Sequence, residues 1–347
     1  MNSAGLRPGL LPKPHWGYAP AWAAVLFGWA LISLPLVDAS TATAQEHRDI
    51  ESQVGLGQLE PTELAITVDD LPVHSVAHPG MTRLDIAAEM IAALQGAGAP
   101  PAYGFANGTP MEGDPAVTSV LSLWYEAGFF LANHTFSHMD LAQVSIETFI
   151  ADIERMDRAL TPWASASSAK LFRYPYLSEG DTHAKRRSVR EYLKQRGYRI
   201  APVTVDYNDW AWSAAYTRCS LAHDEEAMQQ LQGQVVRAAR RKLLEAQRLS
   251  ISLVGRDIKH ILLLHISALT ARTLPAVLAA FQADGVKLIG LPAALEDPVY
   301  RIDPNQLGQR DMTFLMQLSM LRKGDDGSKR SADTSVQFDP AHNICRR

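Results

Sequence analysis

Short apolar runs alternate with longer amphipathic stretches from residue 63 to residue 298. The runs have the length of buried strands, and the stretches repeat their apolar residues at the spacing of a helix. The predicted strands are Leu64–Val68, Ala102–Ala106, Phe129–Asn133, Leu171–Tyr174, Arg199–Val205, Ile261–His265 and Lys287–Gly290. The predicted helices are Arg83–Gly96, Pro115–Ala127, Ser145–Leu160, Thr182–Arg196, Leu221–Leu253 and Ala271–Ala283.

This alternation predicts parallel strands joined by helices, the pattern of an α/β fold. The run Ile261–Leu264 is apolar throughout, as expected of a strand that is buried on both faces. About seven strand–helix repeats favour a barrel over an open sheet, although the count alone does not distinguish the two.

The first 44 residues have the pattern of a secretory signal. Residues 1–20 contain Arg7 and Lys13 and no acidic residue, residues 21–37 are largely apolar, and Ala42 and Ala44 are small residues where a signal peptidase cleaves. We predict a signal peptide over residues 1–44 and an exported protein, periplasmic or secreted, with no stable membrane span after cleavage. An uncleaved membrane anchor is the alternative, because the apolar run is at the short limit for a span.

Two segments flank the alternating region. Residues 45–62 are polar and without clear periodicity, so they are predicted to be a linker. Residues 299–347 are predicted to be a C-terminal tail with one possible helix over 306–321. The rest of that tail is charged and poor in large apolar residues, which favours disorder.

Composition and charge exclude several classes of protein. Hydrophobic residues make up 47% of the 347 positions and charged residues 20%, as in an ordinary globular chain. The net charge is -4 and no long basic stretch occurs, so no nucleic-acid partner is expected. Cys219 and Cys345 form no CxxC pair, which argues against a thiolate metal site. Two independent thiols are favoured over a disulfide, although an exported protein could form one.

Five of the predicted strands end in side chains capable of chemistry. In a parallel barrel the carboxyl ends of the strands converge on one face, where active sites lie. These groups are Asp69 and Asp70; His134 and His138; Arg173 with Pro175 and Tyr176; Asp206 with Asp209 and Trp210; and His265.

The residue types in these groups suit metal-assisted hydrolysis. His134 and His138 are four residues apart, a spacing suited to one metal ion, and one of the two adjacent carboxylates could join them while the other acts on a water. His74 and His78 have the same spacing but lie in a loop bounded by proline and glycine, so we do not predict them as ligands. His74 follows the carboxylates closely enough to line the site.

Each group also has an ordinary structural explanation. Adjacent aspartates favour turns, an arginine at a strand end is often at the surface, tryptophans fill cores, and a lone histidine in an apolar strand is often buried with a partner. The order of all five groups along the chain, rather than any one of them, favours a functional site.

In this order the groups resemble the motifs of the polysaccharide deacetylases of the NodB-homology group, carbohydrate esterase family 4. The resemblance covers residues 63–298 and implies a distorted parallel (β/α) barrel of about seven strands, similar to a TIM barrel. Residues 67–71 read Thr-Val-Asp-Asp-Leu, where the family has Thr-Phe-Asp-Asp-Gly. This match implies that Asp69 is the catalytic base and that Asp70 binds a metal.

The other motifs imply the remaining roles. The family's His-x-x-x-His matches His134 and His138, which would complete an Asp-His-His metal site. Its Arg-x-Pro-Tyr matches residues 173–176, so that Arg173 would pair with the base while Pro175 and Tyr176 shape the substrate site.

Two motifs follow later in the chain. The family's Asp-x-x-Asp-Trp matches residues 206–210, which implies that Asp209 tunes the acid and that Trp210 contacts the substrate. Its Leu-x-Leu-His matches residues 262–265 and makes His265 the general acid.

The resemblance implies hydrolytic removal of N-acetyl groups from an exported or cell-envelope carbohydrate. Water activated by one divalent metal would attack, with an aspartate base and a histidine acid. Zn²⁺ is favoured because two imidazoles and one carboxylate suit it, and Co²⁺, Ni²⁺ and Mn²⁺ also accept these ligands.

Two alternatives are kept open. One is hydrolysis of another non-peptide C–N bond, such as a cyclic amide, on the same site. Leu71 and Pro72 motivate it, because they replace the family's glycine and predict a stiffer, bulkier loop near the substrate. The other is a carbohydrate-binding barrel that has lost catalysis. The long predicted helix 221–253 could also reshape one wall of the cleft.

Overall fold

The structure, a computed structural model, describes residues 60–74, 78–112, 115–164, 169–307, 310–324 and 344–345. Residues 60–347 group into one compact unit. The predicted signal peptide and the predicted linker up to residue 59 lie outside the described residues. Within the described ranges, no helix is both long and apolar enough to cross a membrane.

Seven strands form one sheet, and every pairing between them is parallel. Their order is β5-β4-β3-β2-β1-β6, with β7 also paired to β1. The predicted α/β fold with about seven parallel strands is therefore confirmed. The strands are β1 (Glu63–Leu71), β2 (Tyr103–Ala106), β3 (Phe130–Asn133), β4 (Leu171–Phe172), β5 (Arg199–Ile200), β6 (His260–His265) and β7 (Lys287–Ile289).

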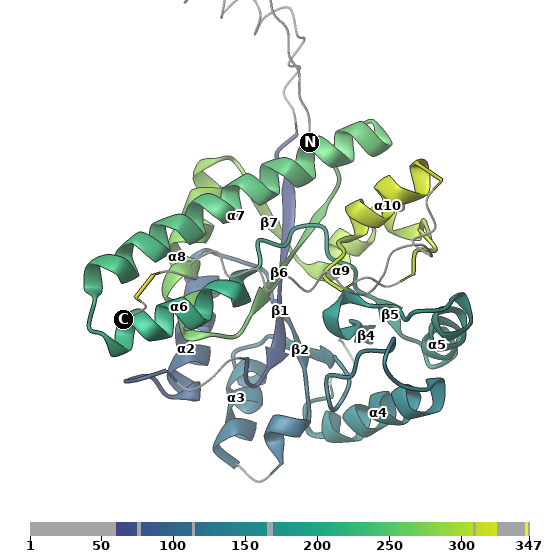
Figure 1. Ribbon diagram of the computed structural model, residues 1–347, viewed down its shortest axis with the longest axis horizontal. Helices are drawn as coiled ribbons and strands as arrows, with labels where there is room; N and C mark the ends of the chain where they lie inside the picture. The colour runs from purple at the N-terminus through teal and green to yellow at the C-terminus, as the bar shows by residue number, and fades with distance from the viewer. Residues whose placement is uncertain are drawn as a thin grey trace, which may run out of the picture. The chain divides into compact units, whose positions relative to one another are not determined.

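The sheet curls until its two ends meet, which makes it a distorted barrel. β5 is short, but the chain beyond it returns to the sheet at Val205, which forms a parallel bridge with Leu262 of β6. On the other side of β6, residues 64–69 of β1 pair along its length. The opposite edge of β1 is shared, since β7 pairs with residues 63–65 and β2 with residues 67–71. β1 therefore has three neighbours and runs through the middle of the molecule (Figure 1).

The helices cover the outside of the barrel, with α7 on one side and α4 and α5 on the other (Figure 1). Local signals set several of their ends. α2 begins after Thr82, whose side chain and that of Asp85 each accept a hydrogen bond from the other's backbone N–H. The helices are α2 (Arg83–Gly96), α3 (Pro115–Glu126), α4 (Ile146–Ala159), α5 (His183–Gln195), α6 (Asp209–Leu221), α7 (Glu225–Val254), α8 (Ala268–Ala283), α9 (Leu291–Leu295) and α10 (Phe314–Arg322).

One predicted helix, 221–253, corresponds to α7, but the structure also has α6 before it, where the sequence predicts a loop after a strand. The two helices are separated because His223 adopts a left-handed φ of 52° and Asp224 then caps α7 through the backbone N–H of Ala227. This arrangement places Asp209 at the first turn of α6, which becomes important for the site.

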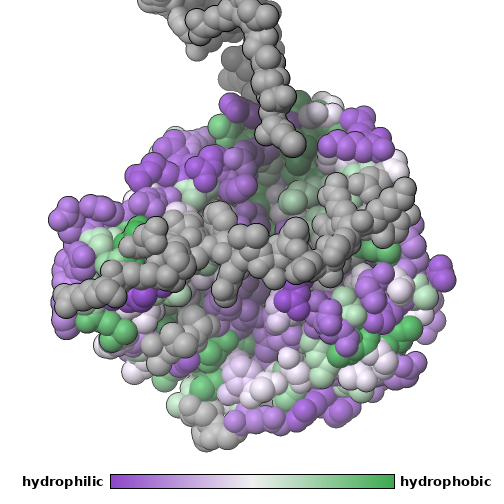
Figure 2. All heavy atoms as spheres, viewed as in Figure 1, coloured by the Kyte–Doolittle hydropathy of each residue, from purple (hydrophilic) through white to green (hydrophobic). Residues whose placement is uncertain are grey.

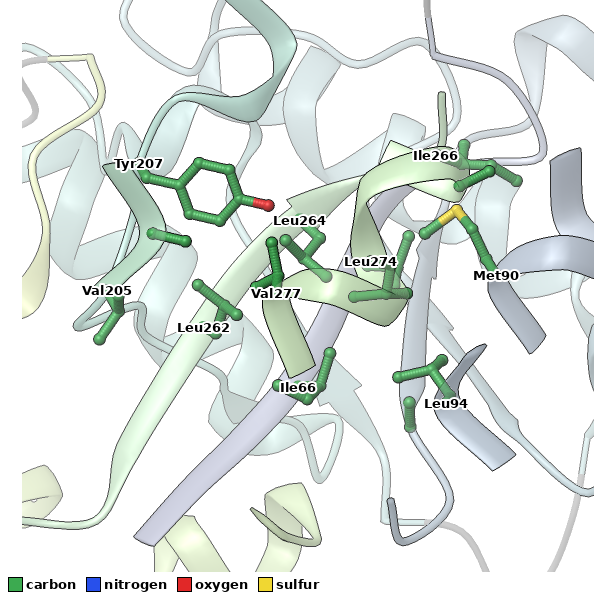
Figure 3. Packing of buried hydrophobic residues seen from close by; sticks show 14 of the residues in the cluster. Ile66, Met90, Leu94, Val205, Tyr207, Leu262, Leu264, Ile266, Leu274 and Val277 are labelled. Carbon is green, nitrogen blue, oxygen red and sulfur yellow. The ribbon is translucent and has the colours of Figure 1, made fainter. Parts of the chain in front are cut away.

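Alternate residues of β1 face different cores, as the period of a strand requires. Leu64, Ile66 and Val68 belong to the main hydrophobic cluster between the sheet and the helices. Ile66 lies there with Leu262 and Leu264 of β6, against Leu274 and Val277 of α8 (Figure 3).

The other row of β1, which starts at Ala65, faces the barrel interior. Ala65 belongs to a second cluster with Tyr103, Phe105 and Ile261 from neighbouring strands, and α9 contributes Leu291 to it. The next residues of this row are Thr67 and Asp69, so the interior changes from apolar to polar toward the carboxyl ends of the strands.

Part of the predicted C-terminal tail is described by the structure and packs on the rest of the chain. The predicted helix is found as α10, and its residues Phe314 and Leu318 join the main cluster. Cys219 of α6 and Cys345 form a disulfide, so the expectation of two independent thiols is wrong. Ile344 packs against the main cluster and brings the neighbouring Cys345 to α6. The two cysteines are 126 residues apart, so their spacing in the sequence does not predict the bond.

Hydrophilic residues predominate on the face seen in Figure 2, and apolar residues form small separate areas on it. This distribution is normal for a surface in contact with water.

Candidate active site and metal centre

Asp69 and Asp70 both face His134, although they are adjacent in the chain. In a regular strand their side chains would point to opposite faces. Here the register with β2 shifts between Asp69 and Leu71, and Asp70 has a left-handed φ of 62°. As a result, Oδ2 of Asp69 lies 3.7 Å and Oδ1 of Asp70 lies 3.6 Å from Nε2 of His134. This bulge at the end of β1 brings both carboxylates to one imidazole.

Asp70, His134 and His138 form one compact group of potential ligands. One ligand atom from each lies within 4.8 Å of the others, and Nε2 of His138 is 3.2 Å from Oδ1 of Asp70. The two histidines are not on a helix. They follow β3 in a loop where His138 has a left-handed φ of 52°, and their rings are 5.0 Å apart.

The chemistry of these three residues fits a divalent cation. Oδ1 of Asp70 is buried and has no hydrogen-bond partner. Nδ1 of His134 is 2.8 Å from the carbonyl oxygen of Arg173, so this nitrogen carries the proton and Nε2 presents a lone pair. Burial lowers the pKa of His138 to about 4, although the charge of Asp70 acts in the opposite direction. His138 is therefore neutral at pH 7, the form that binds metals.

Asp69 is fixed by a buried arginine. Nη1 of Arg173 lies 2.6 Å from Oδ1 of Asp69 and donates also to Oγ1 of Thr67 at 2.8 Å. Its Nε donates to the carbonyl of Ala201, and the guanidinium lies over the ring of Phe105 at 4.1 Å. Because Arg173 occupies Oδ1, the other oxygen of Asp69 is left to face His134.

His265 ends β6 in register with Asp69 of β1, so the two side chains face the barrel interior at the same level. Nδ1 of His265 is 2.7 Å from Oδ1 of Asp209, and its backbone N–H donates to Oδ2 at 2.7 Å. Thr270 donates to the same Oδ2. Burial acts to lower the pKa of His265, but the charge and hydrogen bond of Asp209 outweigh it and raise this pKa to about 10. With Nδ1 bonded, Nε2 is the nitrogen available to a substrate.

His74 lies in the site, as its closeness in sequence to the two carboxylates predicts. Its Nδ1 is 2.8 Å from Oδ2 of Asp70, and its ring centroid is 4.7 Å from that of His265. Burial alone would raise the pKa of Asp70, but the hydrogen bond from His74 and the charges of His138 and His134 outweigh it and lower this pKa.

The three residues predicted to contact the substrate lie in different surroundings. The ring of Tyr176 meets His138 edge-on at 4.5 Å, so it lies beside the group of potential ligands. Pro175 is buried. The backbone N–H of Trp210 donates to Oδ1 of Asp209, which fixes Trp210 at the start of α6 next to the predicted acid pair.

Residues beyond the predicted domain also reach this region. The guanidinium of Arg310 lies over the ring of Tyr176 at 4.1 Å, and its Nε donates to Oδ2 of Asp140. The backbone N–H of Asp311 donates to the carbonyl of Tyr176. One face of Tyr176 is therefore covered by the chain's own arginine. The sequence carries no signal for this contact, because the segment is polar and follows the last predicted strand.

Leu71 does not crowd the site. Its side chain is fully buried, and Gly104 of β2 leaves room for it, since a Cβ added there would lie 2.8 Å from Cδ2 of Leu71 and 3.1 Å from Nε1 of Trp124. The expectation that Leu71 adds bulk next to the substrate is therefore wrong for its side chain, which packs into the core.

Comparison with known proteins agrees with the resemblance seen in the sequence. The family model for polysaccharide deacetylases matches residues 57–201. A chitin deacetylase of Arthroderma benhamiae is 24% identical over 91 residues, which cover 26% of this chain and 23% of that protein. The chain thus matches less than a quarter of the length of this curated relative. The resemblance to the polysaccharide deacetylases is confirmed for the matched segment.

Solved structures with a similar arrangement were also found. The chitin deacetylase of Colletotrichum lindemuthianum is 18% identical, with a TM-score of 0.47 over 68% of this chain and 88% of that chain. A family 4 carbohydrate esterase from Streptomyces lividans is 20% identical, with a TM-score of 0.43 over 68% of this chain and 96% of that chain.

Proposed function

We propose that this chain, whose residues 57–201 match the polysaccharide deacetylases, is a metal-dependent hydrolase that removes N-acetyl groups from a carbohydrate. The observation that carries the proposal is the convergence at the end of β1. A fixed carboxylate, Asp69, lies there beside the metal-ligand group of Asp70, His134 and His138.

In this proposal Asp70, His134 and His138 hold one divalent ion, with zinc favoured by the two imidazoles and one carboxylate. When bound, such an ion lowers the pKa of a water and polarises the acetyl carbonyl. The unpartnered Oδ1 of Asp70 supports this assignment, because a buried carboxylate oxygen without a partner is costly unless a cation or a donor meets it.

Asp69 acts as the base. Its Oδ2 accepts the proton of the attacking water, while Arg173 holds Oδ1 and thereby sets the direction in which Oδ2 points. This orientation accelerates proton transfer, because the carboxylate oxygen that accepts the proton is already aligned before the reaction begins.

His265 acts as the acid. An amine leaves readily only when it gains a proton, so a donor must reach the nitrogen as the C–N bond breaks. Asp209 fixes His265 through Nδ1 and leaves the proton on Nε2 for the leaving amine. Because Asp69 and His265 are paired in register on neighbouring strands, base and acid serve the same substrate.

We also propose that the protein is exported, to the periplasm or to the outside. The Cys219–Cys345 disulfide supports this, because disulfides persist mainly in oxidising compartments. Cell fractionation tests it, and recovery of the protein only from the cytosol would contradict it.

Of the two alternatives, hydrolysis of a cyclic amide loses the support of a bulky Leu71, because that side chain is in the core, and keeps only that of Pro72. A carbohydrate-binding barrel without catalysis stays as an outcome of the test below.

The test is acetate release by the purified full-length chain on N-acetylglucosamine oligomers and peptidoglycan fragments. The chain is stripped with a chelator, measured, and measured again after addition of zinc. We expect release that stops with the chelator and returns with zinc. The variant Asp69→Asn should bind zinc like the unaltered chain and release no acetate. Binding of the oligomers by zinc-loaded protein without acetate release would support the inactive barrel and reject the enzyme.

A further inference from the structure

We infer that His74 is a positioning residue of the metal centre, one that fixes the orientation of the Asp70 carboxylate and supports His265. The inference rests on the proposed function, because it assumes that Asp70 binds the metal.

The two oxygens of Asp70 have separate environments. Oδ1 faces the histidines at 3.2 Å and 3.6 Å, whereas Oδ2 is 2.8 Å from Nδ1 of His74. An ionised carboxylate only accepts hydrogen bonds, so Nδ1 of His74 is the donor. This bond prevents rotation about the Cβ–Cγ bond and keeps Oδ1 directed at His134 and His138. Partners of this kind orient metal ligands and raise metal affinity.

The ring of His74 also contacts the acid side of the site. Its centroid is 4.7 Å from that of His265, with the rings tilted by 43°. His74 therefore lies between a metal ligand and the proposed acid and can keep both in place.

A second histidine of this region, His78, contacts the helix that carries Asp209. His78 stacks on Tyr216 of α6 at 5.3 Å and forms an antiparallel bridge with Met81. α6 begins at Asp209, the partner of His265. His78 therefore packs on α6 and gives a comparison for His74 within the same region.

A second cation held by Asp70, His74 and His265 is the competing interpretation, because these residues also lie within 4.8 Å of one another. Charge argues against it. Asp69, Asp70 and Asp209 carry three negative charges and Arg173 one positive charge, so one divalent ion already neutralises this group.

A further acidic neighbour, Asp206, does not change this balance. Burial raises the pKa of Asp206 to about 6, so it adds at most one more negative charge. A protonated His265, which Asp209 favours, balances that charge. A hydrogen-bonding role for His74 therefore fits the charges better than a ligand role.

The experiment measures the zinc dissociation constant and the zinc content of the full-length chain by competition with a fluorescent chelator and by elemental analysis. The variants are His74→Ala, which removes the donor, and His74→Asn, whose side-chain amide can donate to Asp70. His78→Ala is the matched control, because it lies in the same loop and contacts Tyr216 instead of Asp70. Circular dichroism and thermal unfolding check that each variant folds.

We expect one zinc per chain, an affinity about 10–100-fold weaker in His74→Ala, recovery of most of that loss in His74→Asn, and an unchanged affinity in the control. Equal zinc affinity in folded His74→Ala would overturn the inference. Two zinc ions in the unaltered chain and one in His74→Ala would replace it with a second cation site. Failure of His74→Asn to recover any affinity would also reject a role as hydrogen-bond donor. If the unaltered chain binds no zinc, the proposed zinc centre falls and takes the inference with it, whereas the acetate-release test alone decides the proposed activity.

Discussion

Arg173 and Asp69 form a buried ion pair across the barrel, with Nη1 2.6 Å from Oδ1 and both side chains nearly inaccessible to solvent. The arginine makes two further hydrogen bonds, to Thr67 and to the carbonyl of Ala201. It therefore fixes Asp69 by its shape as well as by its charge.

We predict that Arg173→Lys lowers kcat for acetate release by about 100-fold and leaves zinc affinity unchanged. A lysine keeps the charge but lacks the planar group that bonds Asp69, Thr67 and Ala201 together, so Asp69 loses its alignment, and small misplacements of a catalytic group are costly. Steady-state kinetics and zinc titration measure the two effects. A lysine variant that loses zinc together with activity would mean that Arg173 supports the metal ligands rather than the base.

Replacing a proposed ligand should act on the metal itself. We predict that His138→Ala loses zinc at concentrations that saturate the unaltered chain and loses acetate release with it, because two ligands do not hold zinc firmly. Elemental analysis after dialysis measures the loss. The control is His183→Ala, at the first residue of α5 and outside the ligand group. Full zinc content in His138→Ala would remove this residue from the metal centre.

Asp209→Asn should change the pH dependence of the reaction. Asp209 raises the pKa of His265, and the proposed acid must be protonated, so activity is present below that pKa and lost as the pH rises through it. An asparagine keeps a hydrogen-bond acceptor but removes the charge, so the pKa of His265 falls. We therefore expect the alkaline decline of kcat/KM to move to lower pH. An alkaline limb at the same pH in both proteins would show that it belongs to another group.

Gly104 and Leu71 should be energetically coupled. A methyl group at residue 104 would lie 2.8 Å from the Leu71 side chain, so we expect Gly104→Ala to lower the free energy of unfolding by about 1–3 kcal/mol through overpacking. Leu71→Ala creates the opposite defect, a void.

The double variant Gly104→Ala/Leu71→Ala should be more stable than the sum of the two losses predicts, because the added methyl group occupies space that the leucine vacates. Chemical denaturation of the four proteins completes the cycle. Additive losses would show that the two residues do not share this space.

Local signals predicted most of the helices, but not α6 or α9. α2 has the predicted ends because Thr82 and Asp85 form a capping box within four residues of sequence, and its apolar residues repeat at the helical spacing. The strands were predicted at the right places in the sequence, but some of their lengths were not. The predicted strand 199–205 leaves the sheet after Ile200 and returns only at Val205, which depends on where β6 lies.

The site residues were selected from their order in the sequence, but their geometry depends on features that sequence patterns do not contain. The bulge that turns Asp70 toward His134 arises from the register between β1 and β2. Arg310 covers Tyr176 from a segment more than 130 positions later in the chain, and a polar stretch of this kind resembles a tail. Contacts between residues so far apart in sequence exist only in the folded barrel, so sequence patterns do not predict them.

The three neighbours of β1 also have a consequence for motion. Backbone groups bonded on both sides, within a strand whose side chains are buried, open to solvent only when a large part of a domain unfolds. Asp69, which is paired on both sides at the end of this strand, thus lies on the part of the molecule where amide protons should exchange slowly. The proposed base is therefore held on a part of the molecule that moves little.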